Sequence, residues 1–326
     1  MKKTILSGMR PTGKLHLGHW MGALSNWTAL QQKYRCFFMA ADWHAVMSEY
    51  KDPSKIRELA YDNVSDWLAF GVDPEVSVVF IQSQVPEHLE LFMILSCLAP
   101  LGWLSRCPTF KEQIKQLKDK EVNTYAFLGY PVLQTSDIVL YGAHCVPVGD
   151  DQLPHLELSR KIVRRFNHIY KKDVLIEPQA LLTQSPRLPG LDGRKMSKSY
   201  NNFICLDEDD ESLRKKVLSM ITDPQRIRKS DKGHPEICNV YSYYSSFYPE
   251  LKDDVYKWCT NADRGCKECK AILADKLTVF IGPRREEKHR ILNKKGFIED
   301  ALREGSKKAQ SVARETLSRV KEAMGI

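Results

Sequence analysis

Two short strings, far apart in the chain, carry residue types suited to binding a nucleoside triphosphate. The first is His16-Leu17-Gly18-His19, and the second is Lys195-Met196-Ser197-Lys198-Ser199. Two histidines three residues apart lie on one face of a helical turn, where they can donate hydrogen bonds to oxygens on a reacting phosphorus. Gly18 between them leaves room for a nucleoside to lie against the helix.

The residues before the first string favour the same chemistry. Ser7 to Gly13 contains Arg10, Pro11 and Thr12 and is predicted to connect a strand to the helix that starts near His16. Glycine and proline allow the backbone to approach a ligand closely. The start of a helix offers unpaired amides and a positive dipole end to phosphate.

The second string is predicted to lie in a mobile loop. Residues 186–202 are rich in Gly, Pro and Lys and show no hydrophobic periodicity. The ammonium groups of Lys195 and Lys198 would meet the charge of a leaving pyrophosphate as it develops. Either string alone could be an exposed basic loop or a chance match, but the two together favour a triphosphate site.

Short apolar strands alternating with helices must position these strings. Strands are predicted at 4–6, 36–41, 76–81 and 145–148, and helices at 17–33, 53–70 (capped by Asp52), 86–106, 130–141 and 152–170. This order predicts an α/β fold, a Rossmann-like doubly wound parallel sheet with a helical C-terminal domain. Ligands bind such sheets at the carboxyl ends of the strands.

The expected domains follow from this pattern. Residues 1–190 would form the catalytic domain, 191–206 the loop and linker, and 207–326 a helical domain, whose last helix (297–324) could pack back on the first. The apolar stretch 89–104 contains Glu90, Pro100 and Gly102, so it is expected to be a buried helix or a subunit interface rather than a membrane span. No targeting signal is visible, and we expect a cytoplasmic protein.

The formal net charge of +8 over 326 residues favours a polyanionic partner, although unrelated proteins share it. Basic residues gather in 160–165, 226–232 and 284–321. Each of these groups could equally be a solvated face.

The motifs resemble those of the class I aminoacyl-tRNA synthetases. Within that class, three further strings resemble the bacterial tryptophanyl-tRNA synthetases: Ala41-Asp42-Trp43-His44, Tyr130-Pro131-Val132-Leu133-Gln134-Thr135-Ser136-Asp137-Ile138 and Val146-Pro147-Val148-Gly149-Asp150-Asp151-Gln152. The resemblance implies ATP-dependent activation of L-tryptophan, its transfer to tRNA(Trp), Mg²⁺ as companion of ATP, and a homodimer without membrane attachment.

The resemblance also implies roles for single residues. The catalytic residues would be His16, His19, Lys195 and Lys198. The contacts to ATP would come from Arg10, Pro11, Thr12, Gly18, His19, Gly149, Asp150, Asp151, Leu188, Lys195, Met196, Ser197, Lys198 and Ser199. Asp137 would receive the indole N–H, and Tyr130 and Gln152 would lie near the amino group. Two departures are visible: His19 stands where many members have asparagine, and Arg10 replaces a frequent glutamine.

Elementary chemistry supports the role of Asp137. Indole has one donor and no acceptor. A buried acceptor would be satisfied by tryptophan and left unpaired by phenylalanine. Asp137 could instead cap a helix or form a structural ion pair. The nucleophile of activation, a carboxylate, is already ionised, so positioning and charge stabilisation would suffice.

Nine cysteines without a secretory signal argue against a disulfide framework. Five lie singly in apolar surroundings and are expected to be inert core residues: Cys36, Cys97, Cys107, Cys145 and Cys205. The other four, Cys238, Cys259, Cys266 and Cys269, resemble the motif of a subset of these synthetases that carries a four-iron, four-sulfur cluster. Zn²⁺ or unconnected cysteines are the alternatives.

Three other functions stay open from sequence. A tyrosyl-tRNA synthetase shares the fold and both strings but needs polar partners for a phenol in place of the Asp137 string. A small-molecule adenylyltransferase shares the histidine string but lacks the second string and the helical domain. A non-catalytic paralogue could bind RNA or sense redox state, although the two intact strings argue against it.

Overall fold

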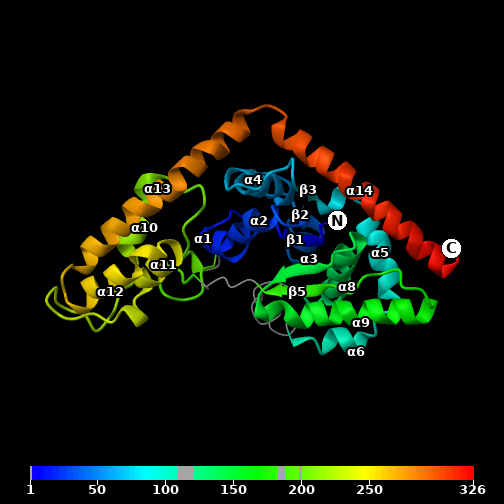
Figure 1. Cartoon of the computed structure of the whole chain (residues 1–326), viewed down its shortest axis with the longest axis horizontal. Coiled ribbons are helices and arrows are strands. Elements are labelled where there is room, and N and C mark those ends of the chain that lie inside the picture. The colour runs from blue at the N-terminus through cyan, green and yellow to red at the C-terminus, as the bar shows by residue number, and fades with distance from the viewer. Residues whose placement is uncertain (1, 109–120, 183–187, 198–199) are drawn as a thin grey trace.

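The computed structural model describes residues 2–108, 121–182, 188–197 and 200–326. At its centre is a five-stranded, fully parallel sheet in the order β3-β2-β1-β4-β5, surrounded by helices (Figure 1). The strands are β1 (Thr4–Met9), β2 (Arg35–Ala40), β3 (Val78–Ile81), β4 (Cys145–Val148) and β5 (Gln179–Leu182). The predicted α/β fold class with a helical C-terminal region is confirmed.

Helices cover both faces of the sheet. They are α2 (Ser25–Leu30), α3 (Asp42–Glu49), α4 (Ile56–Ala69), α5 (Glu87–Ser96), α6 (Leu101–Ser105), α8 (Tyr125–Leu140) and α9 (Leu153–Tyr170), with 3₁₀ turns η2 (Gln82–Gln84) and η3 (Asp150–Gln152). Alternate residues of β2 enter separate cores: Phe38 packs in the core that includes α4, and Phe37 in the core that includes α5, α8 and α9. Burial on both faces explains why this strand reads as a continuous apolar run.

Several predicted elements differ from the observed ones. The helix predicted over 17–33 is broken into α1 (Leu17–His19), a π-helical segment η1 (Trp20–Leu24) and α2. The helix predicted over 86–106 ends at Ser96 and resumes after Pro100, whose missing N–H cannot continue a helix.

Two further expectations were wrong, and one strand was not predicted. Strand β5, unpredicted, adds an edge to the sheet; its residues are largely exposed, so it lacks the apolar signature of a buried strand. Asp52 does not cap α4, because its carboxylate accepts from the backbone and hydroxyl of Ser54 instead. Cys97 is exposed rather than part of the core.

The C-terminal region is helical in its described elements, as predicted. It contains α10 (Asp210–Ser219), α11 (Asn239–Phe247), α12 (Lys252–Thr260), α13 (Cys266–Asn293) and α14 (Phe297–Met324), with 3₁₀ turns η5 (Pro235–Ile237) and η6 (Pro249–Leu251). Helices α13 and α14 meet at an apex and diverge, α13 toward α10–α12 and α14 along the sheet (Figure 1).

Helix α14 packs directly on β3 because one of its residues lacks a side chain. A Cβ on Gly305 would lie 1.8 Å from the carbonyl oxygen of Val79. The next residue, Ser306, donates a hydrogen bond to Gln84 Oε1 at 2.6 Å. The end of the chain is thereby fixed against the sheet.

None of the helices in the described part of the chain combines the length and apolar character that a bilayer span requires.

Candidate functional site

A cavity of about 340 Å³ opens at the carboxyl ends of β1, β2 and β4, within the size range of small-molecule sites. Its lining includes six residues predicted from sequence: Arg10, Tyr130, Asp137, Asp151, Gln152 and Lys195. These residues come from the β1 loop, α8, the η3 turn and the 188–197 segment. The fold therefore brings distant parts of the chain to the carboxyl ends of the strands, where open parallel sheets bind their ligands.

The histidine string and the lysine string lie side by side. The backbone N–H of Leu17 donates to Ile204 O at 3.0 Å, and Leu206 N–H donates to Leu15 O at 3.0 Å. A Cβ on Gly18 would lie 3.4 Å from Met196 Sδ. Although far apart in sequence, the histidine string and the described part of the lysine string are thus direct neighbours.

The histidine pair begins the first helix. The rings of His16 and His19 lie 3.8 Å apart between centroids, and the backbone N–H of His16 donates to His19 Nδ1 at 3.1 Å. Because Nδ1 accepts this hydrogen bond, neutral His19 carries its proton on Nε2. That nitrogen can then act as the donor to a phosphate oxygen.

Asn202 holds the backbone of the lysine segment. Its side-chain oxygen accepts from Ser197 N–H at 2.8 Å, and its amide nitrogen donates to Asp192 Oδ1 at 2.6 Å and to Lys195 O at 3.2 Å. A Cβ on Gly190 would lie 2.2 Å from this amide, so only glycine fits there. Lys195 itself remains exposed at the cavity.

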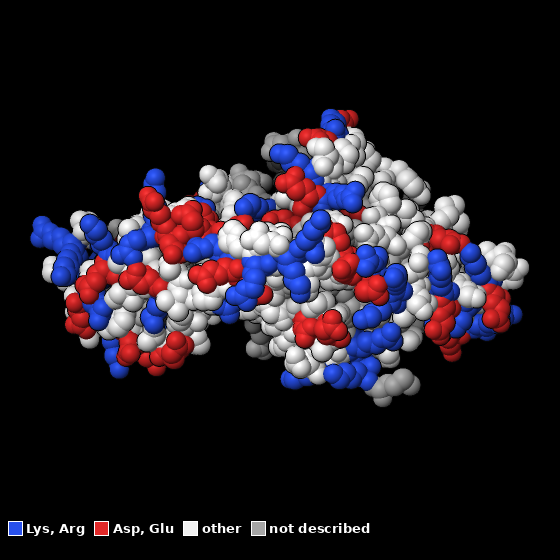
Figure 2. All heavy atoms as spheres, turned by 90° about the horizontal axis from the view of Figure 1, so that it is seen from above, with Lys and Arg blue, Asp and Glu red and all other residues white. Residues whose placement is uncertain are grey.

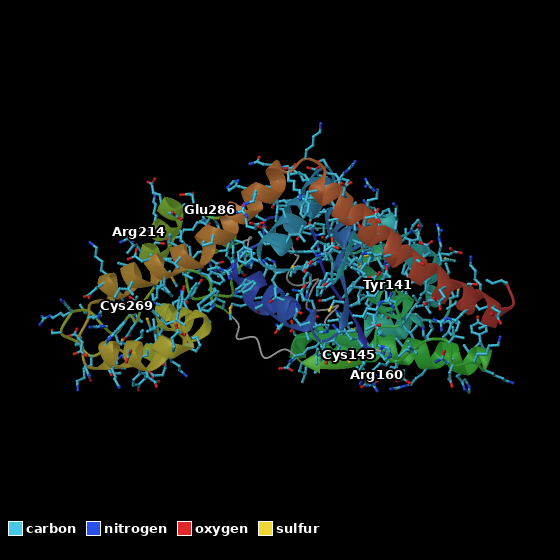
Figure 3. All side chains as sticks on the ribbon, turned by 45° about the horizontal axis from the view of Figure 1, so that its top comes forward. Tyr141, Cys145, Arg160, Arg214, Cys269 and Glu286 are labelled. Carbon is cyan, nitrogen blue, oxygen red and sulfur yellow. The ribbon has the colours of Figure 1, made fainter. Side chains whose placement is uncertain are left out.

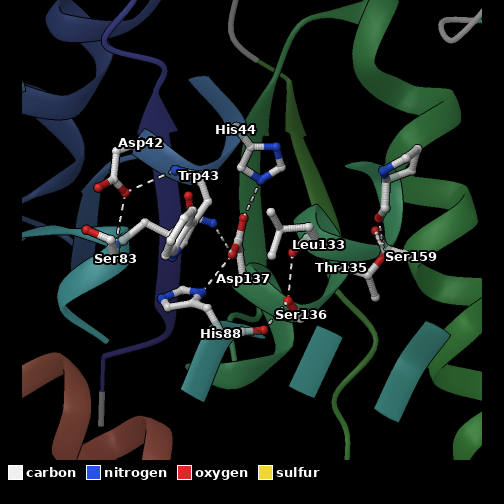
Figure 4. A network of polar contacts seen from close by, with 12 residues as sticks. Asp42, Trp43, His44, Ser83, His88, Leu133, Thr135, Ser136, Asp137 and Ser159 are labelled. Atoms are coloured by element: carbon white, nitrogen blue, oxygen red, sulfur yellow. Dashed lines mark hydrogen bonds and ion pairs between the residues drawn. The ribbon is translucent and has the colours of Figure 1, made fainter. Parts of the chain in front are cut away.

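Asp137 lies at the bottom of the cavity in a network of hydrogen bonds (Figure 4). Its Oδ1 accepts from Gln82 Nε2 at 2.7 Å and from His88 Nδ1 at 2.6 Å, and its Oδ2 accepts from His44 Nε2 at 2.8 Å. Burial alone would raise the pKa of Asp137, but the hydrogen bonds from the two histidines outweigh it and lower the pKa to about 2. Asp137 is therefore a buried carboxylate that stays charged.

Tyr130 and His155 form a second polar pair on the wall. The Tyr130 hydroxyl lies 2.7 Å from His155 Nε2, and burial lowers the pKa of His155 to about 4. A neutral imidazole therefore faces the phenol at neutral pH. Gln152 ends the η3 turn and precedes α9. A Cβ on Gly149 would lie 2.8 Å from Asp151 Oδ1, so a side chain at position 149 would displace this carboxylate.

Other predicted residues lie outside the lining. The residues that do not line it are Pro11, Thr12, His16, Gly18, His19, Gly149, Asp150 and Ser197, and Leu188 and Met196 belong to the buried core that also contains Leu17. Lys198 and Ser199 lie outside the described residues.

Sequence reasoning missed the partners of Asp137. Gln82 belongs to a 3₁₀ turn and His88 to α5, and both are fully buried. The one available signal was a histidine near the start of a mainly apolar helix, which sequence alone does not connect to a carboxylate 49 positions away.

The four C-terminal cysteines line one cavity in the helical region. Cys238 precedes α11, Cys259 lies near the end of α12, and Cys266 and Cys269 lie in the first turn of α13. Cys269 is well separated from Tyr141 and Cys145 near the sheet (Figure 3). No three His, Cys, Asp or Glu side chains of the described residues are grouped as a metal site.

Most basic residues of α13 and α14 are paired with acids. Examples are Arg285 with Asp210 at 2.8 Å and Arg314 with Glu87 at 2.8 Å. Lys and Arg are interleaved with Asp and Glu on the face shown in Figure 2. In the 226–232 loop, by contrast, Arg228, Lys229 and Lys232 are exposed.

Comparison with known proteins agrees with this geometry. The profile of a family described as "tRNA synthetases class I (W and Y)" matches residues 2–281. A Thermotoga maritima protein named tryptophan–tRNA ligase is 46% identical and covers 99% of both chains; one of the same name from Ralstonia nicotianae is 40% identical and covers 99% of this chain and 98% of its own. A solved structure of tryptophanyl-tRNA synthetase from Campylobacter jejuni, complexed with ADP and tryptophan, has a TM-score of 0.89 at 29% identity and covers 99% of this chain and 100% of that chain.

Proposed function

This chain belongs to the class I tRNA synthetases, among the tryptophan–tRNA ligases, and we propose that it activates tryptophan with ATP in the cavity lined by Asp137 and Lys195. The observation that carries this proposal is that one cavity is lined by both the buried carboxylate of Asp137 and the exposed side chain of Lys195, from the second string. An amino-acid site and a triphosphate site separated on the surface could not perform the reaction.

In the proposed mechanism, the carboxylate of tryptophan attacks the α-phosphorus of ATP, and pyrophosphate leaves. His16 and His19, at the start of the first helix, donate to oxygens of the reacting phosphorus, and Lys195 neutralises charge on the departing pyrophosphate. Lys198 would act with Lys195. Mg²⁺ enters with ATP as part of the substrate and shares the charge of its phosphates.

The other predicted residues orient the substrates. Tyr130 and Gln152 would bind the amino group, and Gly149 with Asp150 and Asp151 would hold the ribose. Arg10, Pro11, Thr12 and Gly18 would contact ATP, with Leu188, Met196, Ser197 and Ser199 completing its site. The support for these roles is that Arg10, Tyr130, Asp151 and Gln152 line the cavity. A Cβ on Gly18 would also lie only 3.4 Å from Met196 of the second string.

Selectivity for tryptophan rests on the free position at Asp137. A carboxylate offers about four acceptor positions, of which the described residues use three. The fourth, on Oδ2, would receive the indole N–H. Phenylalanine would leave this buried charge short of a donor, which a hydrogen-bonding site can penalise by about 10⁴-fold or more.

Amino-acid-dependent exchange of pyrophosphate with ATP tests the proposal directly. We expect exchange with tryptophan, and none above background with tyrosine or phenylalanine. Exchange dependent on tyrosine would favour the tyrosyl-tRNA synthetase reading, and no exchange with any of the twenty amino acids would favour a non-catalytic paralogue.

The second step would pass tryptophan to the terminal ribose of tRNA(Trp). The exposed cations Arg228, Lys229 and Lys232 are better placed for phosphate contacts than the paired residues of α13 and α14. Charge neutralisation of Lys229 and Lys232 together should reduce the salt dependence of tRNA affinity, lowering the slope of log K against log salt by about 2. An unchanged slope would remove this loop from the tRNA interface.

For the four cysteines we propose a four-iron, four-sulfur cluster, because all four line one cavity and four thiolates are the ligand set of such clusters. A single zinc ion binds thiolates at about 2.3 Å, and no three His, Cys, Asp or Glu side chains of the described residues are grouped to hold one metal ion. A Cβ on Gly233 would lie 2.4 Å from Cys259 Sγ, so glycine leaves the room that this thiol needs. When bound, the cluster would cross-link α11, α12 and α13.

Analysis of anaerobically purified protein tests the cluster. We expect about four iron and four sulfide per chain, with absorbance near roughly 400 nm, all lost in Cys269→Ser. Removal of the iron by a chelator should lower the unfolding temperature of the helical region. A colourless preparation that contains zinc, or no metal, would overturn the assignment.

A homodimer is the proposed assembly. Met93 and Leu101, within the apolar stretch 89–104, are each 65% exposed in the single chain. Burial of such side chains against a second copy would remove an apolar surface from water. Analytical ultracentrifugation should give twice the chain mass, and Met93→Lys should shift the protein toward monomer.

A further inference from the structure

A buried relay runs behind Asp137, away from the cavity. His88 is fully buried; its Nδ1 lies 2.6 Å from Asp137 Oδ1, and its Nε2 lies 2.7 Å from the hydroxyl of Tyr141. Asp137 lines the cavity, whereas His88 and Tyr141 do not. Through its side chain, His88 contacts the cavity lining at Asp137.

The Tyr141 phenol determines the direction of these hydrogen bonds. Burial, with smaller contributions from the charges of Asp137 and Glu87, raises the pKa of Tyr141 well above its usual value, so the phenol keeps its proton. The phenol has one hydrogen to donate, and His88 Nε2 is the acceptor. His88 then carries its own proton on Nδ1, facing Asp137. The ring of Tyr141 is stacked on Phe37 at 4.6 Å between centroids, which fixes its position.

The relay determines how Asp137 presents its oxygens. His88 and Gln82 together fill the acceptor positions of Oδ1, and only Oδ2, held by His44, keeps one open. Without the donor from His88, burial would favour the neutral carboxyl or a rotated carboxylate. Either change would weaken the acceptor for an indole N–H.

We propose that His88, held in one tautomer by Tyr141, is the positioning residue that makes this cavity select a ring bearing an N–H donor. The inference rests on the proposed activation of tryptophan. It adds the residues that keep Asp137 ionised and correctly oriented to accept the indole N–H. His88 is not a catalytic residue, because it contacts neither substrate nor phosphate.

The test compares tryptophan with β-(3-benzothienyl)alanine, in which sulfur replaces the N–H at nearly the same size. In pyrophosphate exchange, His88→Leu should lower the ratio of kcat/KM for tryptophan over the analogue by roughly 10- to 100-fold, mainly through the KM for tryptophan. His88→Asn should recover most of the ratio, because its amide nitrogen can take the place of Nδ1 and donate to Asp137.

Tyr141→Phe keeps the stacked ring and removes the hydroxyl, so it tests whether Tyr141 holds His88 in one tautomer. We expect the ratio to fall roughly 2- to 10-fold. The matched control is Tyr248→Phe, whose hydroxyl donates to Lys276 O in the helical region and should leave the ratio unchanged. Thermal unfolding of each variant identifies loss of fold. If His88→Leu is unfolded, the selectivity ratio of Tyr141→Phe tests the inference instead.

Two results would overturn the inference: equal losses for both substrates in His88→Leu, with the ratio unchanged, or no recovery in His88→Asn. An unchanged ratio in Tyr141→Phe would remove the tautomer lock. Failure of the proposed function is distinguishable, because the wild-type protein would then show no exchange with tryptophan.

Discussion

Among single residues, Asp137 determines which ring can occupy the cavity. It is 2% exposed, and although burial raises its pKa, the hydrogen bonds and charges of His44 and His88 outweigh burial and lower the pKa to about 2. A carboxylate with such a pKa does not titrate between pH 5 and 9, so tryptophan binding should show no acid limb from this group.

Asp137→Asn tests this residue. The amide keeps the shape of the carboxylate but loses its charge, and its NH₂ group would face the N–H donors that the carboxylate accepts from. The kcat/KM for tryptophan should therefore fall by roughly 10- to 150-fold, and discrimination against phenylalanine should fall with it. Pyrophosphate exchange with both amino acids measures the change. Asp42→Asn is the matched control: its carboxylate accepts from the backbones of Trp43 and Ser83 outside the cavity, so it should leave discrimination intact. Retained discrimination in Asp137→Asn would contradict the assignment.

The sequence indicated which residues meet at the cavity but not what supports them. Asp137 and Lys195 were predicted because they belong to strings with chemical meaning. The relay through His88 and Tyr141 was not, because it forms only when α5 packs on α8, and local pattern does not contain that contact.

Among the elements, those with strong local signals were predicted and the exceptions have physical causes. Strand β2 is buried on both faces and reads as a strand. Strand β5 is short and exposed, and its identity as a strand depends on pairing with β4. The break between α5 and α6 was signalled by Pro100, although the predicted helix ran through it.

The close packing of α14 on β3 predicts how a substitution at Gly305 changes stability. Gly305→Ala would place a methyl group 1.8 Å from Val79 O, so α14 must move from the sheet, and the free energy of unfolding should fall by about 3 kcal/mol or more. Gly22→Ala, in η1, meets nothing within 4 Å and should raise it by up to about 1 kcal/mol through helix propensity. Urea denaturation of both variants measures the difference. Equal effects would show that α14 does not pack as described.

At the scale of the whole molecule, a buried charge cluster joins the helical region to the sheet region. Lys288 of α13 is 3% exposed, and its Nζ lies 2.8 Å from Asp62 Oδ1, 2.9 Å from Asp66 Oδ1 and 3.2 Å from Asp207 Oδ2. Asp207 also binds Lys14, two residues before the histidine string, at 2.7 Å. The cluster thus connects α13 and α4 to the segment that leads into the ATP site.

Lys288→Met should be strongly destabilising. It would leave the buried Asp66 and the partly buried Asp62 and Asp207 without their shared cation, at a cost of about 3–5 kcal/mol in unfolding free energy. Arg214→Met breaks an exposed pair with Asp275, also on α13, and should cost less than about 1 kcal/mol. Chemical denaturation distinguishes them, and similar small losses in both would show that the cluster does not hold the two regions together.

The cluster also predicts a dependence on pH. Burial, only partly offset by Lys288, raises the pKa of Asp66 to about 7. The folded chain therefore binds this proton more tightly than the unfolded chain, whose aspartate has a pKa of about 3.9, and the contribution of Asp66 to stability falls as pH rises from about 4 through 7. Asp66→Asn should remove that loss, so its stability relative to wild type should increase between pH 5 and 8. A constant difference between the two proteins over this range would contradict the shift.

The most direct test of the account is the rate of tryptophanyl-adenylate formation in Lys195→Ala, measured in a single turnover beside the affinity for tryptophan. If the two distant strings act on one ATP, the rate should fall by roughly 10²- to 10³-fold while tryptophan affinity changes less than about twofold. Arg194→Ala, which removes the neighbouring cation outside the cavity lining, should change the rate far less. An unchanged rate in Lys195→Ala, or an equal loss in both variants, would contradict the convergence of the two strings on one nucleotide.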